Sequence, residues 1–243
     1  MGIDAVAEQL QTTLAGMQAR ADPRRYFLAV YLRVTLAIRA ELTAGGFRDP
    51  DWVDRWDAVF ASLYLDAVAR ADRSEPVPGP WAVAFAADRQ PPVRQVLLGM
   101  NAHINYDMPQ ALLAVLPAAE FADPERLAGR QADHRRIDAV LARRVTAEGD
   151  EAERLGRIGR TDRLLRPLNE RATRRFLHEA REKVWTNAVR LDTARSRGPE
   201  QLAYRLGELE RLSTGRLQRL CAPGPVLLAL AVGGFGVVLP PTR

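Results

Sequence analysis

The sequence is poor in cysteine, lysine and histidine. Among its 243 residues there are three histidines, and Cys221 and Lys183 are the only residues of their types. A single cysteine excludes an intramolecular disulfide and any zinc module built from several cysteines. The first ten residues, MGIDAVAEQL, have neither the basic start nor the apolar run of a signal peptide. We therefore expect a cytoplasmic location.

A hydrophobic run long enough to cross a bilayer is also missing. The strongest run, residues 225–239, has 15 residues and includes three glycines. A membrane-spanning helix needs about 20 apolar residues, so we predict no membrane span. This apolar tail must instead be buried against the core or at an interface, and it is a candidate surface for a homo-oligomer.

Basic residues exceed acidic ones, but their distribution does not favour a nucleic-acid surface. There are 35 basic and 30 acidic residues, which gives a net charge of +5. Residues 1–123 carry a net charge of −4 and residues 124–220 one of +8. Five arginines at every third position from Arg154 to Arg166 would spread around a helix instead of forming one stripe. We interpret them as a solvated surface and predict no nucleic-acid partner, with a phosphate-binding arm as the alternative.

Apolar residues recur with helical spacing along most of the chain. Val6, Leu10, Leu14 and Met17 share one helix face. Asp-Pro pairs at 22–23, 49–50 and 123–124 indicate capped helix starts, and prolines at 92, 167 and 199 indicate further starts. Pro109 is expected to break or restart the helix that begins near residue 92.

No segment shows the alternation of a strand or the dipeptide of a hairpin. The segment 75–80, EPVPGP, is followed at once by Trp81, so we interpret it as a loop within one core and not as a domain linker. The sequence therefore predicts an all-α fold: one multi-helix, bundle-like domain over residues 1–243, with the apolar tail 225–239 packed on the core or at an interface.

Each histidine is followed four residues later by a carboxylate. The pairs are His103 with Asp107, His134 with Asp138, and His178 with Glu182. On a helix such residues lie one turn apart on the same face, so a ring nitrogen and a carboxylate oxygen can reach one cation. These ligands suit zinc, iron or manganese, and helical bundles build metal sites in this way. We predict that all six residues are metal ligands; the alternative is a set of ordinary ion pairs at helical spacing.

The surroundings of the three pairs differ. His134 is followed by two arginines and is expected at the surface, whereas His103 lies in an apolar stretch between Asn101 and Asn105. Because buried polar groups need partners, the two asparagines, His103 and Asp107 indicate a hydrogen-bonded cluster or a site. Asn101 and Asn105 are thus candidate ligand-binding residues. No glycine-rich phosphate loop is present, and we predict no organic cofactor.

Three stretches, LLGMNAHINYDMPQAL, YFLAVYLRVT and FRDPDWVDRW, resemble an uncharacterised, largely actinobacterial family of helical proteins. That family is a domain of unknown function, and the resemblance covers most of the chain. It implies a helical fold and no particular reaction.

HINYD and HEARE are also similar to the His-x3-Asp and His-x3-Glu metal pairs of the all-helical zinc-dependent phospholipase C and single-strand nuclease superfamily. This similarity implies that His103, Asp107, His178 and Glu182 are ligands. That superfamily uses more histidines than this chain has, and it also uses a mature N-terminal amino group after secretion. A complete trinuclear site is therefore excluded, whereas a remaining site for one or two metals, or an inactive relative, stays open.

Two functions follow from these observations. The first is a metal-dependent hydrolase acting on a small molecule or a phosphoester, in which Asp107 or Glu182 is the base if it is not a metal ligand. The alternative is a non-enzymatic helical module that binds a partner or an apolar ligand and contains a buried His/Asn/Asp cluster.

Overall fold

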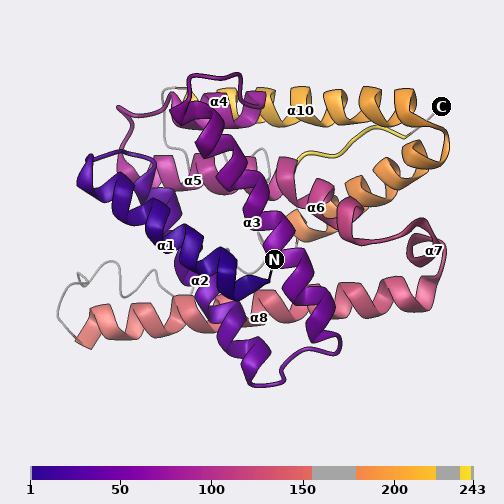
Figure 1. Ribbon diagram of the computed structural model, residues 1–243, viewed down its shortest axis with the longest axis horizontal. Helices are drawn as coiled ribbons and strands as arrows, with labels where there is room; N and C mark the ends of the chain where they lie inside the picture. Colours follow the sequence, from indigo (N-terminus) through magenta and orange to yellow (C-terminus); the bar gives the residue numbers. More distant parts are fainter. Residues whose placement is uncertain (1, 155–178, 223–235, 242–243) are drawn as a thin grey trace.

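The computed structural model describes the backbone of residues 2–154, 179–222 and 236–241, and the side chains of these residues except 141–154. All regular secondary structure in these ranges is helical, which confirms the predicted all-α class. Residues 179–196 are helical as well. The remaining elements are α1 (Ile3–Ala19), α2 (Arg25–Thr43), α3 (Pro50–Asp72), α4 (Gly79–Phe85), α5 (Pro92–Ala102), η1 (His103–Asp107), α6 (Met108–Val115), α7 (Ala118–Phe121), α8 (Pro124–Arg154) and α10 (Pro199–Cys221) (Figure 1).

The helix starts confirm most of the Asp-Pro predictions. The carboxylate of Asp49 accepts a hydrogen bond from the backbone N–H of Trp52 at 2.9 Å and so caps α3, as expected for an N-cap. Asp123 accepts the N–H groups of Glu125 and Arg126 at the start of α8. Helix α2 begins at Arg25, two residues later than predicted, and the carboxylate of Asp22 accepts hydrogen bonds from the backbone N–H and the guanidinium of Arg24.

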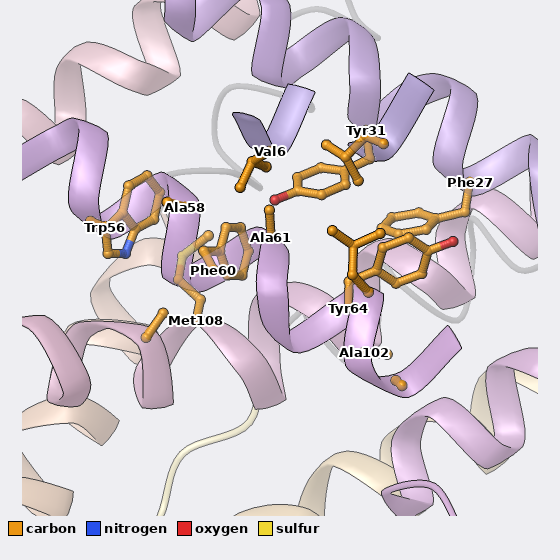
Figure 2. Packing of buried hydrophobic residues seen from close by; sticks show 14 of the residues in the cluster. Val6, Phe27, Tyr31, Trp56, Ala58, Phe60, Ala61, Tyr64, Ala102 and Met108 are labelled. Atoms are coloured by element: carbon orange, nitrogen blue, oxygen red, sulfur yellow. The ribbon is translucent and has the colours of Figure 1, made fainter. Parts of the chain in front are cut away.

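The core lies where α1, α2, α3 and α5 pack together, and aromatic side chains fill much of it (Figure 2). Trp52, Trp56 and Phe60 stack along one face of α3, at ring-centroid distances of 6.1 and 5.4 Å. Phe27 of α2 meets Tyr64 of α3 edge to face at 5.1 Å. The side chains on α3 recur at every fourth position, which is helical spacing, and their burial contributes to the hydrophobic stabilisation of the core.

The helix that begins at Pro92 restarts near Pro109, which was one of the two predicted outcomes. It passes through η1, a five-residue π-helix, and continues as α6, in which Pro109 is the second residue. Pro109 has no N–H for the carbonyl four residues earlier, and its ring would crowd that carbonyl in a regular α-helix. A π-helical turn opens the backbone there, and such turns are frequent at functional sites.

Helix α8 crosses the α2 side of the molecule, and α10 lies along α4 and α5 (Figure 1). A second, smaller hydrophobic cluster lies between α6, the helix 179–196 and α10. No helix in the described part of the chain is both long and apolar enough to cross a membrane. The arginines from Arg154 to Arg166 lie outside the residues whose side chains are described.

Candidate functional site

A cavity of about 110 Å³ lies beside the aromatic core. Helices α2, α3, α5, η1, α6 and α8 and the start of the helix 179–196 contribute its walls. Most of the lining is apolar, and the polar lining residues come from five elements: α2, α3, η1, α8 and the helix 179–196. The lining side chains are Phe27, Val30, Tyr31, Val34, Ile38, Trp56, Asp57, Phe60, Met100, His103, Ile104, Met108, His134, Ile137, Asp138, Ala180 and Arg181.

The His103 imidazole is held in a defined orientation at this cavity. Its Nδ1 lies 2.8 Å from Oδ2 of Asp107, one helical turn away, and the same oxygen accepts a hydrogen bond from Nε1 of Trp81 at 2.9 Å. The ring stacks on Phe60 with a centroid distance of 3.6 Å and an interplanar angle of 7°. All four side chains are buried. The predicted polar cluster is therefore present, and Trp81 is a member that the sequence did not indicate.

Burial determines the protonation of this pair. Removal from water raises the pKa of Asp107 well above its usual value and lowers the pKa of His103 well below its own. Both shifts favour a pair with no net charge. Such a pair keeps one proton between Nδ1 and Oδ2 and a second proton on Nε2 of His103. Among the described residues Nε2 has no hydrogen-bond partner, so the pair presents an N–H donor at the cavity.

His134 is buried, so its predicted surface position is wrong. Arg135 and Arg136, which suggested exposure, occupy the solvent face of α8, while His134 and Ile137 face the core. The indole N–H of Trp185 donates to Nδ1 of His134 at 2.8 Å. Because an indole nitrogen can only donate, the ring proton of neutral His134 is on Nε2. Burial lowers the pKa of His134 well below its usual value, and the charge of nearby Arg181 lowers it further.

Asp57 is the residue at the cavity that the sequence reading missed. It is about 1% exposed, and neither carboxylate oxygen has a hydrogen-bond partner among the described residues. Burial raises its pKa to about 7, and the charge of Asp54 adds to this shift. The helical spacing could have indicated its burial, because position 57 lies four residues after buried Val53 and three before buried Phe60.

The remaining predicted ligands lie elsewhere or are engaged by other groups. Asp138 forms an ion pair with Arg181, whose guanidinium also donates to the backbone carbonyl of His134. Glu182 is exposed and does not line the cavity; it lines a separate groove together with Arg135 and Arg190. His178 lies outside the described residues.

In the described part of the chain, no three side chains of the His, Cys, Asp or Glu type are placed to hold a metal ion together. Asn101 and Asn105, the predicted ligand-binding pair, are buried beside the His103 pair and bond to each other. The side-chain N–H₂ of Asn105 donates to the backbone carbonyl and to Oδ1 of Asn101, at 3.0 and 3.1 Å. Neither asparagine lines the cavity. They fix the π-helix, and their neighbours His103 and Ile104 line the cavity.

Comparison with known proteins gives one match. Residues 3–223 match the model of a family of unknown function (DUF5995), and because this covers most of the sequence, the chain belongs to that family. No curated protein and no solved structure matches it. The cavity, η1 and both buried histidines lie within the matched residues.

Proposed function

We propose that this protein binds a small, largely apolar molecule with an oxygen acceptor in the cavity between α2, α3, η1 and α8. One observation carries the proposal: His103, His134 and Asp57 line the same cavity, and each has a buried polar atom without a partner among the described residues. A buried polar group without a hydrogen bond costs about 1–3 kcal/mol. A ligand that satisfies these groups recovers that free energy on binding.

The size of the cavity limits the ligand. Its volume of about 110 Å³ is similar to that of an engineered apolar cavity of about 150 Å³ that holds benzene. The apolar walls suit a single ring or a short branched chain. Protons on Nε2 of His103 and His134 are donors, so the polar end of the ligand must accept a hydrogen bond, as a ketone, amide or ester carbonyl does.

Acetophenone and its hydrocarbon isostere α-methylstyrene test this proposal because they differ only at the acceptor. Acetophenone should shift the imidazole ¹⁵N signals of His103 and His134 and bind saturably. Its preference over the isostere should fall about tenfold in His103→Phe, which keeps the stacking on Phe60 and removes the donor. We would measure affinity by calorimetry and ring protonation by NMR.

A variant that fills the cavity provides the control. Val34→Phe places a ring in the cavity and should abolish binding of both molecules. Val93→Phe makes the same change at a side chain that is 66% exposed and lies off the cavity, so binding should persist. The proposal fails if acetophenone does not bind the wild-type protein, or if Val34→Phe binds it as well as Val93→Phe does.

A metal-dependent hydrolase is the second candidate function. Two imidazoles and the Asp57 carboxyl line one cavity and are ligand types that zinc accepts. No three such side chains in the described part of the chain are placed to hold one ion together, so a metal here would use at most two of them, with water in the remaining positions. A bound metal would lower the pKa of a coordinated water and so supply a nucleophile for a phosphoester or another small substrate. A histidine that binds a metal through Nε2 must lose its Nε2 proton, whereas the binding of an oxygen acceptor requires that proton. The two candidate functions therefore need different protonation states of the same nitrogen atoms.

Metal analysis separates the two candidate functions. The hydrolase function requires about one zinc, iron or manganese ion per chain after purification. It also requires a loss of thermal stability on chelation that disappears in His103→Ala, with Glu182→Gln as the exposed control. Metal-free protein whose stability is insensitive to chelators, and which does not hydrolyse bis(p-nitrophenyl) phosphate with added zinc, would rule this function out.

A further inference from the structure

The C-terminal residues 236–241 form an extended segment that lies between α6, the helix 179–196 and α10 (Figure 1, yellow). The segment follows the part of the chain that matches the family model, which ends at residue 223. The segment lies outside the matched residues and is held by specific contacts with residues inside them.

Two buried asparagines bind the main chain of this segment. Asn187 donates from Nδ2 to the carbonyl of Val237 at 2.9 Å and accepts at Oδ1 the N–H of Leu239 at 2.8 Å. Asn105 accepts the N–H of Val237 at 3.1 Å. The guanidinium of Arg205 donates to the carbonyl of Pro240. The three bonds from the asparagines replace those that a neighbouring strand would supply.

The side chains of the segment alternate between the core and solvent. Leu239 is 0% exposed, Val237 is also buried, and Val238 between them is 40% exposed. The two buried side chains pack in the second hydrophobic cluster, with Leu113, Leu191 and Leu209. This is the period-two pattern of a strand, although no strand partner is present among the described residues.

Recognition through the main chain, combined with pockets for alternate side chains, is how proteins bind extended peptides. We propose that Asn105, Asn187 and the second hydrophobic cluster form a peptide-binding site whose ligand is an extended apolar segment. The C-terminal segment of the same chain is the resident ligand. A peptide of the same pattern competes with it for the site.

Occupancy of this site also acts on η1. Asn105 lies in the π-helix between His103 and Asp107, and it joins the segment to Asn101. When the segment is released, Oδ1 of Asn105 loses the hydrogen bond that it accepts from the N–H of Val237. Asn105, Asn187 and the second hydrophobic cluster do not line the cavity. Peptide binding is therefore independent of ligand binding in the cavity.

Hydrogen exchange on the wild-type protein is the first test. The amides of Val237 and Leu239 should be protected, but they should open at least ten times more often than core amides such as that of Leu28. Asn187→Ala should increase the exchange of both amides, and Val238→Ala, at the exposed position between them, should not. Exchange of both amides at the rate of the core amides would overturn the proposal, because the segment would then be an integral part of the domain.

Binding in trans is the second test. Leu239→Asp places a charge in the cluster and should release the segment. A fluorescent peptide GVVLPPTR should then bind this full-length variant saturably, at least tenfold more tightly than it binds the wild type or than a scrambled peptide binds the variant. A folded variant that does not bind the peptide overturns the proposal. If the variant does not fold, the wild-type exchange rates decide.

Discussion

The stability of Asp57→Asn relative to the wild type should rise by a few kcal/mol between pH 5 and pH 8. Burial raises the pKa of Asp57 to about 7, whereas an unfolded chain releases this proton near pH 4. The folded protein therefore binds more protons than the unfolded chain in this range, so the free energy of unfolding falls as pH rises from about 4 to about 7. Three pH units correspond to roughly 4 kcal/mol, which sets the upper limit.

Urea unfolding of both proteins at several pH values measures this difference. Asparagine carries no charge at any of these pH values, so the difference between the two proteins isolates Asp57. Asp66→Asn, at an exposed carboxylate that pairs with Arg70, should show a difference of less than about 1 kcal/mol throughout. A gap for Asp57→Asn that does not change with pH would mean that the Asp57 carboxyl is not protonated in the folded protein.

The same titration affects the cavity. Below pH 7 Asp57 is protonated and can donate to a carbonyl, and above pH 7 its negative charge opposes an oxygen acceptor. Binding of acetophenone should therefore weaken as pH rises from 6 to 8 in the wild type. In Asp57→Asn the affinity should be constant over the same range.

Replacing Asp107 by leucine should lower the free energy of unfolding by about 3–5 kcal/mol, because it leaves two buried groups without their shared hydrogen-bond partner. The Trp81 indole N–H and Nδ1 of His103 both lie within hydrogen-bond distance of one Asp107 oxygen. Urea unfolding at pH 7 measures the loss. A loss below about 1 kcal/mol would show that the hydrogen bonds to this oxygen do not stabilise the folded protein.

Asp107→Asn is a useful comparison with Asp107→Leu, because asparagine keeps the shape of the side chain and changes which atoms of the pair carry protons. Trp81 can only donate, so the amide oxygen must take the position of Oδ2, and His103 must then donate from Nδ1. Neutral His103 consequently loses its proton on Nε2 and presents an acceptor at the cavity. We expect a stability loss of about 1–2 kcal/mol, a changed ¹⁵N pattern of the imidazole, and weaker binding of acetophenone but not of α-methylstyrene.

Local sequence patterns predicted the helices well. The Asp-Pro start of α3 was correct because a cap depends on residues within one turn of each other. The cluster around His103 was predicted because several polar residues occurred in an apolar stretch, where each needs a partner. Pro109 correctly marked a restart of the helix. The π-helical turn before it was not predicted, because a proline in the sequence does not determine how the preceding turn opens.

The position of His134 could not be read from its neighbours. Two arginines follow it in sequence, but adjacent residues on a helix point in different directions. Which face of α8 is buried depends on where the helix 179–196 lies, and its Trp185 donates to His134. The charges along α8 therefore cannot predict that Trp185, on another helix, packs against His134.

The sequence by itself determined the all-α class, the positions of most helix starts and the buried polar cluster beside Pro109, because each depends on spacings within a few turns. Only the tertiary structure decided that His103, His134 and Asp57 line one cavity and that Asp107 also accepts a hydrogen bond from Trp81. These residues come from α3, α4, η1 and α8, which lie apart along the chain. Helical periodicity assigns a residue to a face of its own helix, but the packing of the helices against one another determines which faces meet.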